Sequence, residues 1–111
     1  NPLGCALGLE VINYINEEKP HLRAKELGDW FIKELTAYDL KKVKDVRGRG
    51  LMIGIEVSKE FGEAYQYCLE LTKLGVITKD TRKSTMRVAP PLIIEKADLA
   101  HGMSLIKKVL Q

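Results

Sequence analysis

The sequence has 111 residues, of which 45% are hydrophobic and 30% are charged. This length suits one folded domain and is too short for two, and the apolar content is too high for a disordered chain. The 18 basic and 15 acidic side chains give a formal charge of +3 and are interspersed, so nucleic acid is not an expected partner. No apolar run approaches the ~20 residues of a membrane span, so a membrane is not expected either.

Two helices are predicted at the beginning of the chain. In residues 3–18 the apolar positions Leu3, Leu7, Val11 and Ile15 repeat at helical spacing, and nearly every side of the helix is apolar. We therefore expect this helix to be buried on more than one face. Pro20 should end it, because proline has no amide hydrogen and crowds the preceding turn. A second helix is expected over about residues 21–38, with an apolar stripe of Leu27, Trp30, Phe31, Leu35 and Tyr38.

Two pairs of strands are predicted further along the chain. Alternation of apolar and other side chains over residues 51–57 indicates a strand, and residues 43–46 could pair with it through a glycine-rich turn at residues 47–50. The second pair is expected at residues 76–78 and 85–89, joined by a polar loop. Pro90 and Pro91 should end the last strand, because proline cannot continue a ladder.

A third helix is expected between the strand pairs, with Gly75 as its left-handed cap. A fourth helix is expected over residues 96–110. The order helix, helix, strand pair, helix, strand pair, helix predicts an α+β fold in which helices cover a small, largely antiparallel sheet. No internal linker is visible, so residues 1–111 are predicted to form one domain. The chain lacks a starting Met and a signal peptide, and we expect it to be a piece of a longer polypeptide.

Few side chains indicate chemistry on their own. His21 and His101 have no partners at metal-ligand spacing, so no metal site is predicted. The two cysteines, Cys5 and Cys68, are 63 positions apart and form no CxxC pair, which favours a reducing compartment. Lys79 could act as a Schiff-base nucleophile only if it were desolvated, and its charged loop predicts a solvated amine.

Arg87 is the most informative candidate for a binding residue. In the strand at residues 85–89, Met86 and Val88 share the face that must point to the core, so Arg87 points to the opposite face. A guanidinium held on a strand between small residues suits bidentate binding of a carboxylate. The alternative from spacing alone is a solvated arginine on an exposed sheet face.

Three segments together resemble the class III aminotransferases, which depend on pyridoxal phosphate (PLP). They are NPLGCA at residues 1–6, DVRGRGLMIGIE at residues 45–56 and RVAPPLII at residues 87–94, and they occur in the order and spacing of that family. Within the class, the Gly4-Cys5 pair and the segment GVITKDT at residues 75–81 are most similar to the ornithine aminotransferases. The resemblance covers the whole chain.

The resemblance implies the carboxyl-terminal small domain of a fold type I PLP enzyme, with residues 1–18 as the helix that connects to a large domain. The activity it implies is transfer of the δ-amino group of ornithine to 2-oxoglutarate by a homodimer. The catalytic lysine and the other cofactor-binding residues of the family lie upstream, so neither catalytic nor cofactor-binding residues are expected in this chain. One substrate-binding residue is implied: Arg87, which would bind a carboxylate of the amino-group acceptor and exchange pairing with a glutamate of the large domain.

Two alternatives stay open at the level of the sequence. The donor could be acetylornithine or another ω-amino acid, because donor contacts lie mostly outside these residues. The chain could also be a free-standing α+β binding or interaction module. The expected location is the cytoplasm, with the mitochondrial matrix as the alternative.

Overall fold

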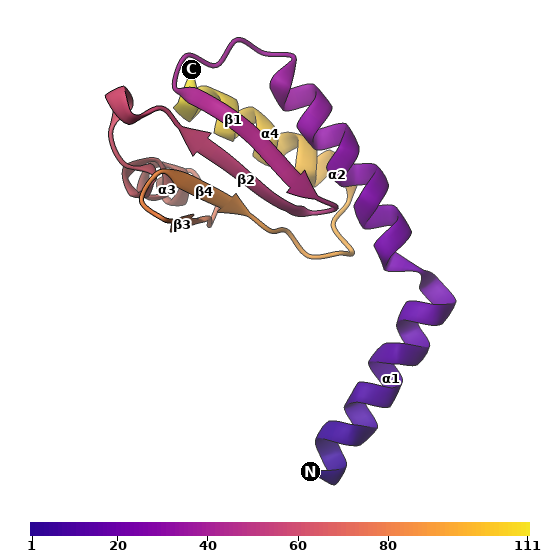
Figure 1. Cartoon of the computed structure of the whole chain (residues 1–111). Helices are drawn as coiled ribbons and strands as arrows, with labels where there is room; N and C mark the ends of the chain where they lie inside the picture. Colours follow the sequence, from indigo (N-terminus) through magenta and orange to yellow (C-terminus); the bar gives the residue numbers. More distant parts are fainter.

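The computed structural model describes residues 1–111 and confirms the α+β class (Figure 1). The chain forms four helices, one short 3-10 turn and a four-stranded sheet. The helices are α1 (Pro2–Glu18), α2 (Pro20–Thr36), α3 (Ala64–Lys73) and α4 (Lys96–Leu110), and the 3-10 turn is η1 (Lys59–Phe61). The strands are β1 (Val43–Arg49), β2 (Met52–Val57), β3 (Lys79–Thr81) and β4 (Thr85–Val88).

The sheet has the strand order β1-β2-β4-β3, and every neighbouring pair is antiparallel. In Figure 1, α2, α3 and α4 lie on one side of the sheet and leave its other face open. The alternation predicted for residues 51–57 is confirmed, since Leu51, Ile53, Ile55 and Val57 are all buried. They pack in one core with apolar side chains of the three helices, of which the largest fully buried ones are Phe31, Leu35, Leu71, Ile106 and Leu110.

The turn predicted at residues 47–50 is shorter than expected. Arg47, Gly48 and Arg49 belong to β1 and pair with β2, so only Gly50 and Leu51 make the reversal. Gly50 supports it with a left-handed φ of 55°. Gly48 instead allows β1 and β2 to approach closely, because a Cβ atom there would lie 2.6 Å from the carbonyl oxygen of Met52.

The strand predicted at residues 76–78 is wrong, and β3 lies in the segment that was expected to be a loop. The amide of Val76 donates to the carbonyl of Leu71 and the amide of Gly75 to that of Thr72, so this segment closes the end of α3. Gly75 has the predicted left-handed φ, at 87°. The hairpin from β3 to β4 then turns at Arg82 and Lys83, which also adopt left-handed φ values of 51° and 61°.

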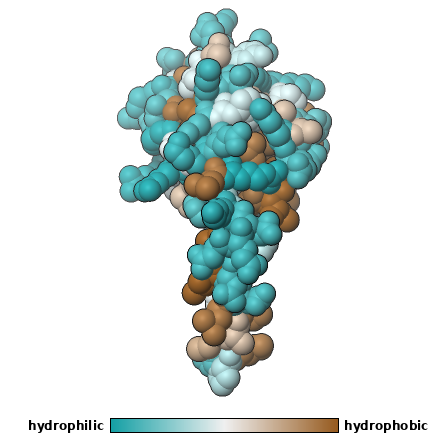
Figure 2. Space-filling view, turned by 90° about the vertical axis from the view of Figure 1, so that its right-hand side faces the viewer, coloured by the Kyte–Doolittle hydropathy of each residue, from teal (hydrophilic) through white to brown (hydrophobic).

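The predicted burial of the first helix is not found within this chain. The side chain of Asn1 accepts a hydrogen bond from the amide of Gly4 and begins α1, and Lys19 ends it in a left-handed conformation before Pro20 opens α2. None of its residues is buried; Leu3, for example, is 70% exposed. Figures 1 and 2 show α1 as a stalk with apolar surface that projects from the rest of the molecule. No helix is long and apolar enough to cross a membrane.

The second helix is confirmed in position but ends earlier than predicted. Its inner face buries Ala24, Leu27, Gly28, Phe31 and Leu35, and Trp30 packs against the core while half-buried. Tyr38 lies beyond the helix end and is exposed. Its ring is covered by Lys107, whose Nζ atom lies 3.2 Å from the ring centroid.

We predict that Gly28→Ala destabilises the fold even though alanine favours helices over glycine. A Cβ atom at position 28 would lie 2.0 Å from the carbonyl oxygen of Gly50, so α2 must move away from the β1–β2 turn. Overpacking of this kind costs about 1–3 kcal/mol of unfolding free energy, measurable by urea denaturation. Gly102→Ala is the matched control: no atom lies within 4 Å of a Cβ atom there, so α4 should keep or gain stability. Equal effects of the two substitutions would contradict the assigned packing.

Candidate functional site

The open face of the sheet carries a row of paired residues across all four strands, and three of the four residues are basic. The pairing places Arg47 of β1 opposite Gly54 of β2, Gly54 opposite Arg87 of β4, and Arg87 opposite Lys79 of β3. The neighbouring row runs from Asp45 through Glu56 and Thr85 to Thr81. Side chains of directly paired residues lie on the same face of a sheet, so both rows belong to one polar surface.

Arg87 lies where the strand alternation predicts. Its neighbours in β4, Met86 and Val88, are buried in the core, and Arg87 itself is exposed on the open face. Thr85 shares that face but is buried, with its methyl group against the backbone of Gly54. The guanidinium of Arg87 forms no ion pair and no hydrogen bond with another residue of the chain, so all its donors are available to a ligand.

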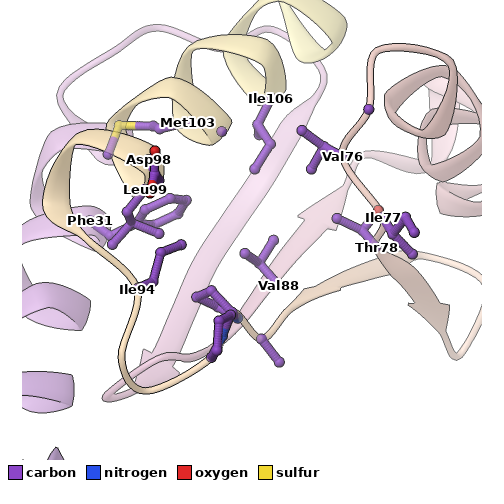
Figure 3. A pocket seen from close by; sticks show the side chains of 15 residues that line it. Phe31, Val76, Ile77, Thr78, Val88, Ile94, Asp98, Leu99, Met103 and Ile106 are labelled. Carbon is purple, nitrogen blue, oxygen red and sulfur yellow. The ribbon is translucent and has the colours of Figure 1, made fainter.

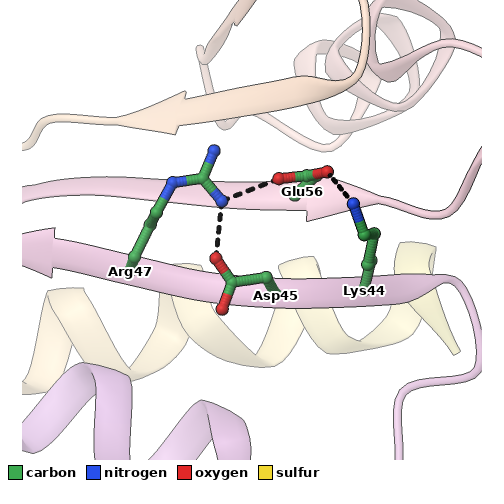
Figure 4. A network of polar contacts seen from close by, with 4 residues as sticks. All are labelled: Lys44, Asp45, Arg47 and Glu56. Carbon is green, nitrogen blue, oxygen red and sulfur yellow. Dashed lines mark hydrogen bonds and ion pairs between the residues drawn. The ribbon is translucent and has the colours of Figure 1, made fainter.

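The basic charges of β1, by contrast, are neutralised within the chain (Figure 4). One amino group of Arg47, Nη1, donates to Oδ2 of Asp45 at 2.5 Å and to Oε2 of Glu56 at 2.8 Å. The other oxygen of Glu56, Oε1, accepts from Nζ of Lys44 at 2.7 Å. Two cations and two carboxylates therefore form a charge-balanced cluster, which we call the β1–β2 ion cluster (Lys44, Asp45, Arg47 and Glu56).

Glu56 is the centre of this cluster. Its side chain is 20% exposed, whereas those of Arg47 and Lys44 are 54% and 63% exposed. The hydrogen bonds from Lys44 and then Arg47 hold the pKa of the Glu56 carboxyl below its ordinary value, and partial desolvation opposes them. Glu56 is therefore a carboxylate at neutral pH.

A shallow hollow of about 250 Å³ lies on the open face beside Arg87. Its floor includes Gly54, and its rim includes Arg47, Arg82 and Arg87. Because Gly54 has no side chain, the surface between Arg47 and Arg87 stays free. A Cβ atom at position 54 would lie 3.3 Å from Cγ2 of Thr85, which is tight packing. The hollow is thus an open site with positive charge on its rim, suited to a small anion such as a carboxylate.

The alternation of β4 predicts the open-face position of Arg87, whereas no pattern in the sequence indicates the β1–β2 ion cluster or the pairing of Gly54 with Arg47 and Arg87. The alternation of β2 already placed Gly54 and Glu56 on one face. The pattern does not predict the register with β1, because the two glycines at positions 48 and 50 indicate a turn over residues 47–50. Once Arg47 belongs to β1, its position opposite Gly54 follows.

Two larger cavities have fewer charged side chains that could bind an anion. One of about 330 Å³ lies between α4, the segment after α3 and the two prolines after β4, and Figure 3 shows mainly apolar side chains around it, including Phe31, Val88 and Ile106. Another of about 650 Å³ lies where the start of α2 meets the β1–β2 turn. No group of three potential metal-ligating side chains exists in the chain.

No lysine of this chain forms a site that fits PLP. Lys79 is exposed in β3, as expected for a solvated amine. The two half-buried lysines are already engaged: Nζ of Lys42 donates to the carbonyl of Val109 at 3.0 Å, and Lys107 covers the ring of Tyr38. A covalent PLP site needs a lysine that is both accessible and desolvated beside a phosphate-binding pocket, and these side chains do not provide it.

Comparison with known proteins gives one consistent family. Residues 1–110 match the family model described as aminotransferase class-III. The ornithine aminotransferase of Bacillus subtilis is 41% identical over 111 residues, which are 100% of this chain and 27% of that protein. The ornithine aminotransferase of Brevibacillus brevis is 39% identical over 110 residues, which are 99% of this chain and 27% of that protein. The chain thus spans about a quarter of the length of these relatives.

Solved structures agree with the sequence comparison. An ornithine aminotransferase from Plasmodium yoelii matches with a TM-score of 0.92 and 37% identity, over 99% of this chain and 30% of that one. An acetylornithine aminotransferase from Elizabethkingia anophelis matches with a TM-score of 0.86 and 30% identity, over 99% of this chain and 28% of that one.

We predict that Glu56 makes the stability of the domain sensitive to acid. Its folded-state pKa is lowered, so its contribution is present above the unfolded-state pKa and is lost as the pH falls through the folded-state value. The advantage of the wild type over Glu56→Gln in unfolding free energy should therefore shrink between about pH 5 and pH 3, around the ordinary glutamate pKa. Urea denaturation at a series of pH values measures it. Glu60→Gln, which removes a carboxyl group with no ion-pair partner, is the control and should show no such trend. A pH-independent difference for Glu56→Gln would contradict the ion cluster.

Proposed function

Because the chain belongs to the class III aminotransferases, we propose that residues 1–111 form the carboxyl-terminal small domain of a PLP-dependent ornithine aminotransferase. The complete enzyme would transfer the δ-amino group of ornithine to 2-oxoglutarate. On this proposal the chain does not carry the catalytic lysine. Its contribution is to bind and orient a substrate carboxylate.

The observation that carries this proposal is the free guanidinium of Arg87. Every charged group of the β1–β2 ion cluster is paired, whereas Arg87 faces an open hollow without a partner. A planar guanidinium on a rigid strand can donate two parallel hydrogen bonds to a carboxylate, which sets the orientation of the substrate as well as its affinity. Gly54 leaves the space in which such a carboxylate would sit.

PLP, when bound, supplies the stabilisation of the carbanion that amino transfer requires. The lysines of this chain are solvated or engaged, so we propose that the cofactor is held by residues outside it. The role of Arg87 is then to bind the carboxylate of 2-oxoglutarate so that its keto carbon faces the cofactor.

We also propose that the apolar surface of α1 packs against the rest of the enzyme. Leu3, Leu7, Leu9 and Val11 are all more than half exposed in the chain alone, and exposed apolar surface of this extent usually marks an interface. Residues 1–18 would then be the helix that connects the small domain to a large domain. The same proposal includes a homodimer of the complete chain, as the family resemblance implies.

Ornithine is the proposed donor because the ornithine aminotransferases have the higher similarity among the relatives described above, both in sequence and in structure. Acetylornithine is the second candidate, supported by the match to the Elizabethkingia enzyme. Steady-state rates of the complete enzyme with each donor distinguish the two: the proposal requires a higher kcat/KM for ornithine.

We predict that Arg87→Met in the complete enzyme mainly impairs the half-reaction with 2-oxoglutarate. The kcat/KM for 2-oxoglutarate should fall at least about 30-fold, because loss of one partner from a charged hydrogen-bond pair that the bound substrate would bury costs on the order of 2–5 kcal/mol. Stopped-flow absorbance of the cofactor after mixing with 2-oxoglutarate measures this half-reaction alone.

Arg49→Met is the matched control for this prediction. Arg49 lies in β1 at the end of the sheet, carries the same charge and has no ion-pair partner, so its loss should change the half-reaction little. Unchanged kinetics in Arg87→Met, or equal losses in both variants, would remove Arg87 from the substrate site.

A further inference from the structure

Arg87 can bind a substrate carboxylate only if no carboxylate of its own domain pairs with it first. Glu56 is the acidic residue that the register brings nearest. Glu56 lies opposite Thr85, and Arg87 follows two positions later on the same strand and the same face. Diagonal neighbours of this kind lie about 7–8 Å apart between strands, within reach of two long side chains.

The side chain nearest the path between the two is that of Thr85, which is small and buried, with its Cγ2 atom beside Gly54. The residue directly opposite Arg87 is Gly54, which has no side chain that could block the approach of Glu56. Both Gly54 and Arg87 line the same hollow. Sterics therefore do not prevent an ion pair between Glu56 and Arg87.

The β1–β2 ion cluster prevents it instead, because both oxygens of Glu56 are occupied on the side away from Arg87. Lys44 donates to Oε1 at 2.7 Å and Arg47 donates to Oε2 at 2.8 Å (Figure 4). The same amino group of Arg47 is also bound by Asp45, which fixes it over β1. Arg47 thus binds the oxygen of Glu56 that would otherwise be free to turn across Gly54.

We propose that Arg47 is a positioning residue that holds Glu56 away from Arg87 and so keeps the Arg87 guanidinium free for a substrate carboxylate. The inference rests on the proposed function of Arg87 but concerns Arg47 and Glu56, to which that function assigns no role. Arg47 acts through Glu56 and does not itself bind the substrate. Without it, Glu56 keeps only Lys44 and competes with the substrate for Arg87.

Two other roles of Arg47 make different predictions. If Arg47 were a second carboxylate-binding cation, its loss would weaken substrate binding whether or not Glu56 was present. If it served stability alone, its loss would leave the affinity for substrate unchanged. Only the positioning role predicts that removing Glu56 restores the affinity for substrate that the loss of Arg47 weakens.

The first test follows the titration of Glu56 and needs no enzyme activity. Its carboxyl resonance in the 111-residue chain is titrated by NMR in the wild type and in Arg87→Met, Arg47→Met and the double variant. In the wild-type background, Arg87→Met should leave the Glu56 titration nearly unchanged. In the Arg47→Met background it should lower the acid dissociation constant of Glu56 about three- to fivefold, the scale of a partly exposed ion pair. The same effect of Arg87→Met in both backgrounds, or in neither, would overturn the inference.

The second test measures KM for 2-oxoglutarate in the complete aminotransferase. Arg47→Met should raise it about three- to fivefold, because the new Glu56–Arg87 pair must break before the substrate binds. Adding Glu56→Gln to Arg47→Met should return KM to the wild-type value, whereas a failure to return would contradict the positioning role. Arg49→Met removes the same charge from the same strand without touching Glu56, and its KM should stay unchanged.

The two tests separate the failure of this inference from the failure of the proposed function. If Glu56 couples to Arg87 in the titration but Arg87→Met leaves the half-reaction with 2-oxoglutarate unchanged, the proposed function is wrong. If Arg87→Met impairs that half-reaction and Glu56→Gln fails to rescue Arg47→Met, the positioning role of Arg47 is wrong and the function of Arg87 stands.

Discussion

The burial of one face of β2 and β4 is the constraint on which the rest of the structure depends. Ile53, Ile55 and Met86 are almost fully removed from solvent against α2, α3 and α4. A shift of either strand by one residue would expose these side chains and bury a charged one, so the hydrophobic effect strongly favours the observed register. Arg87 and Gly54 lie on the open face as a direct consequence.

The same register arranges the charges of the open face. β1 contributes Lys44, Asp45 and Arg47, and these side chains meet Glu56 on β2 in a cluster with no net charge. Such exposed pairs add little stability individually. Their effect on the site is to leave Arg87 as a guanidinium with every donor free, next to a strand position without a side chain.

The sequence predicted the elements whose pattern is strong and misplaced those set by hydrogen bonds of the backbone. The helical stripes and the alternation of residues 51–57 located α2, α3, α4 and β2, because burial alone produces these patterns. The position of β3 could not be predicted, since residues 76–78 are used to close α3 and the hairpin begins only at Lys79. The alternation of buried and exposed residues in β4 predicts the face on which Arg87 lies. The ion cluster depends on the register between β1 and β2, and the polar sequence of β1 has no pattern that predicts this register. The apolar character of α1 is visible in the sequence, but no other part of this chain covers it.

Our central claim is that Arg87, left unpaired by the β1–β2 ion cluster, binds a substrate carboxylate above Gly54. A crystal structure of the complete aminotransferase with bound 2-oxoglutarate tests this claim most directly. We expect one carboxylate of the ligand to accept two hydrogen bonds from Arg87, with Glu56 still bound to Lys44 and Arg47. A ligand held without contact to Arg87, or an Arg87 paired with Glu56 beside the bound ligand, would contradict the claim.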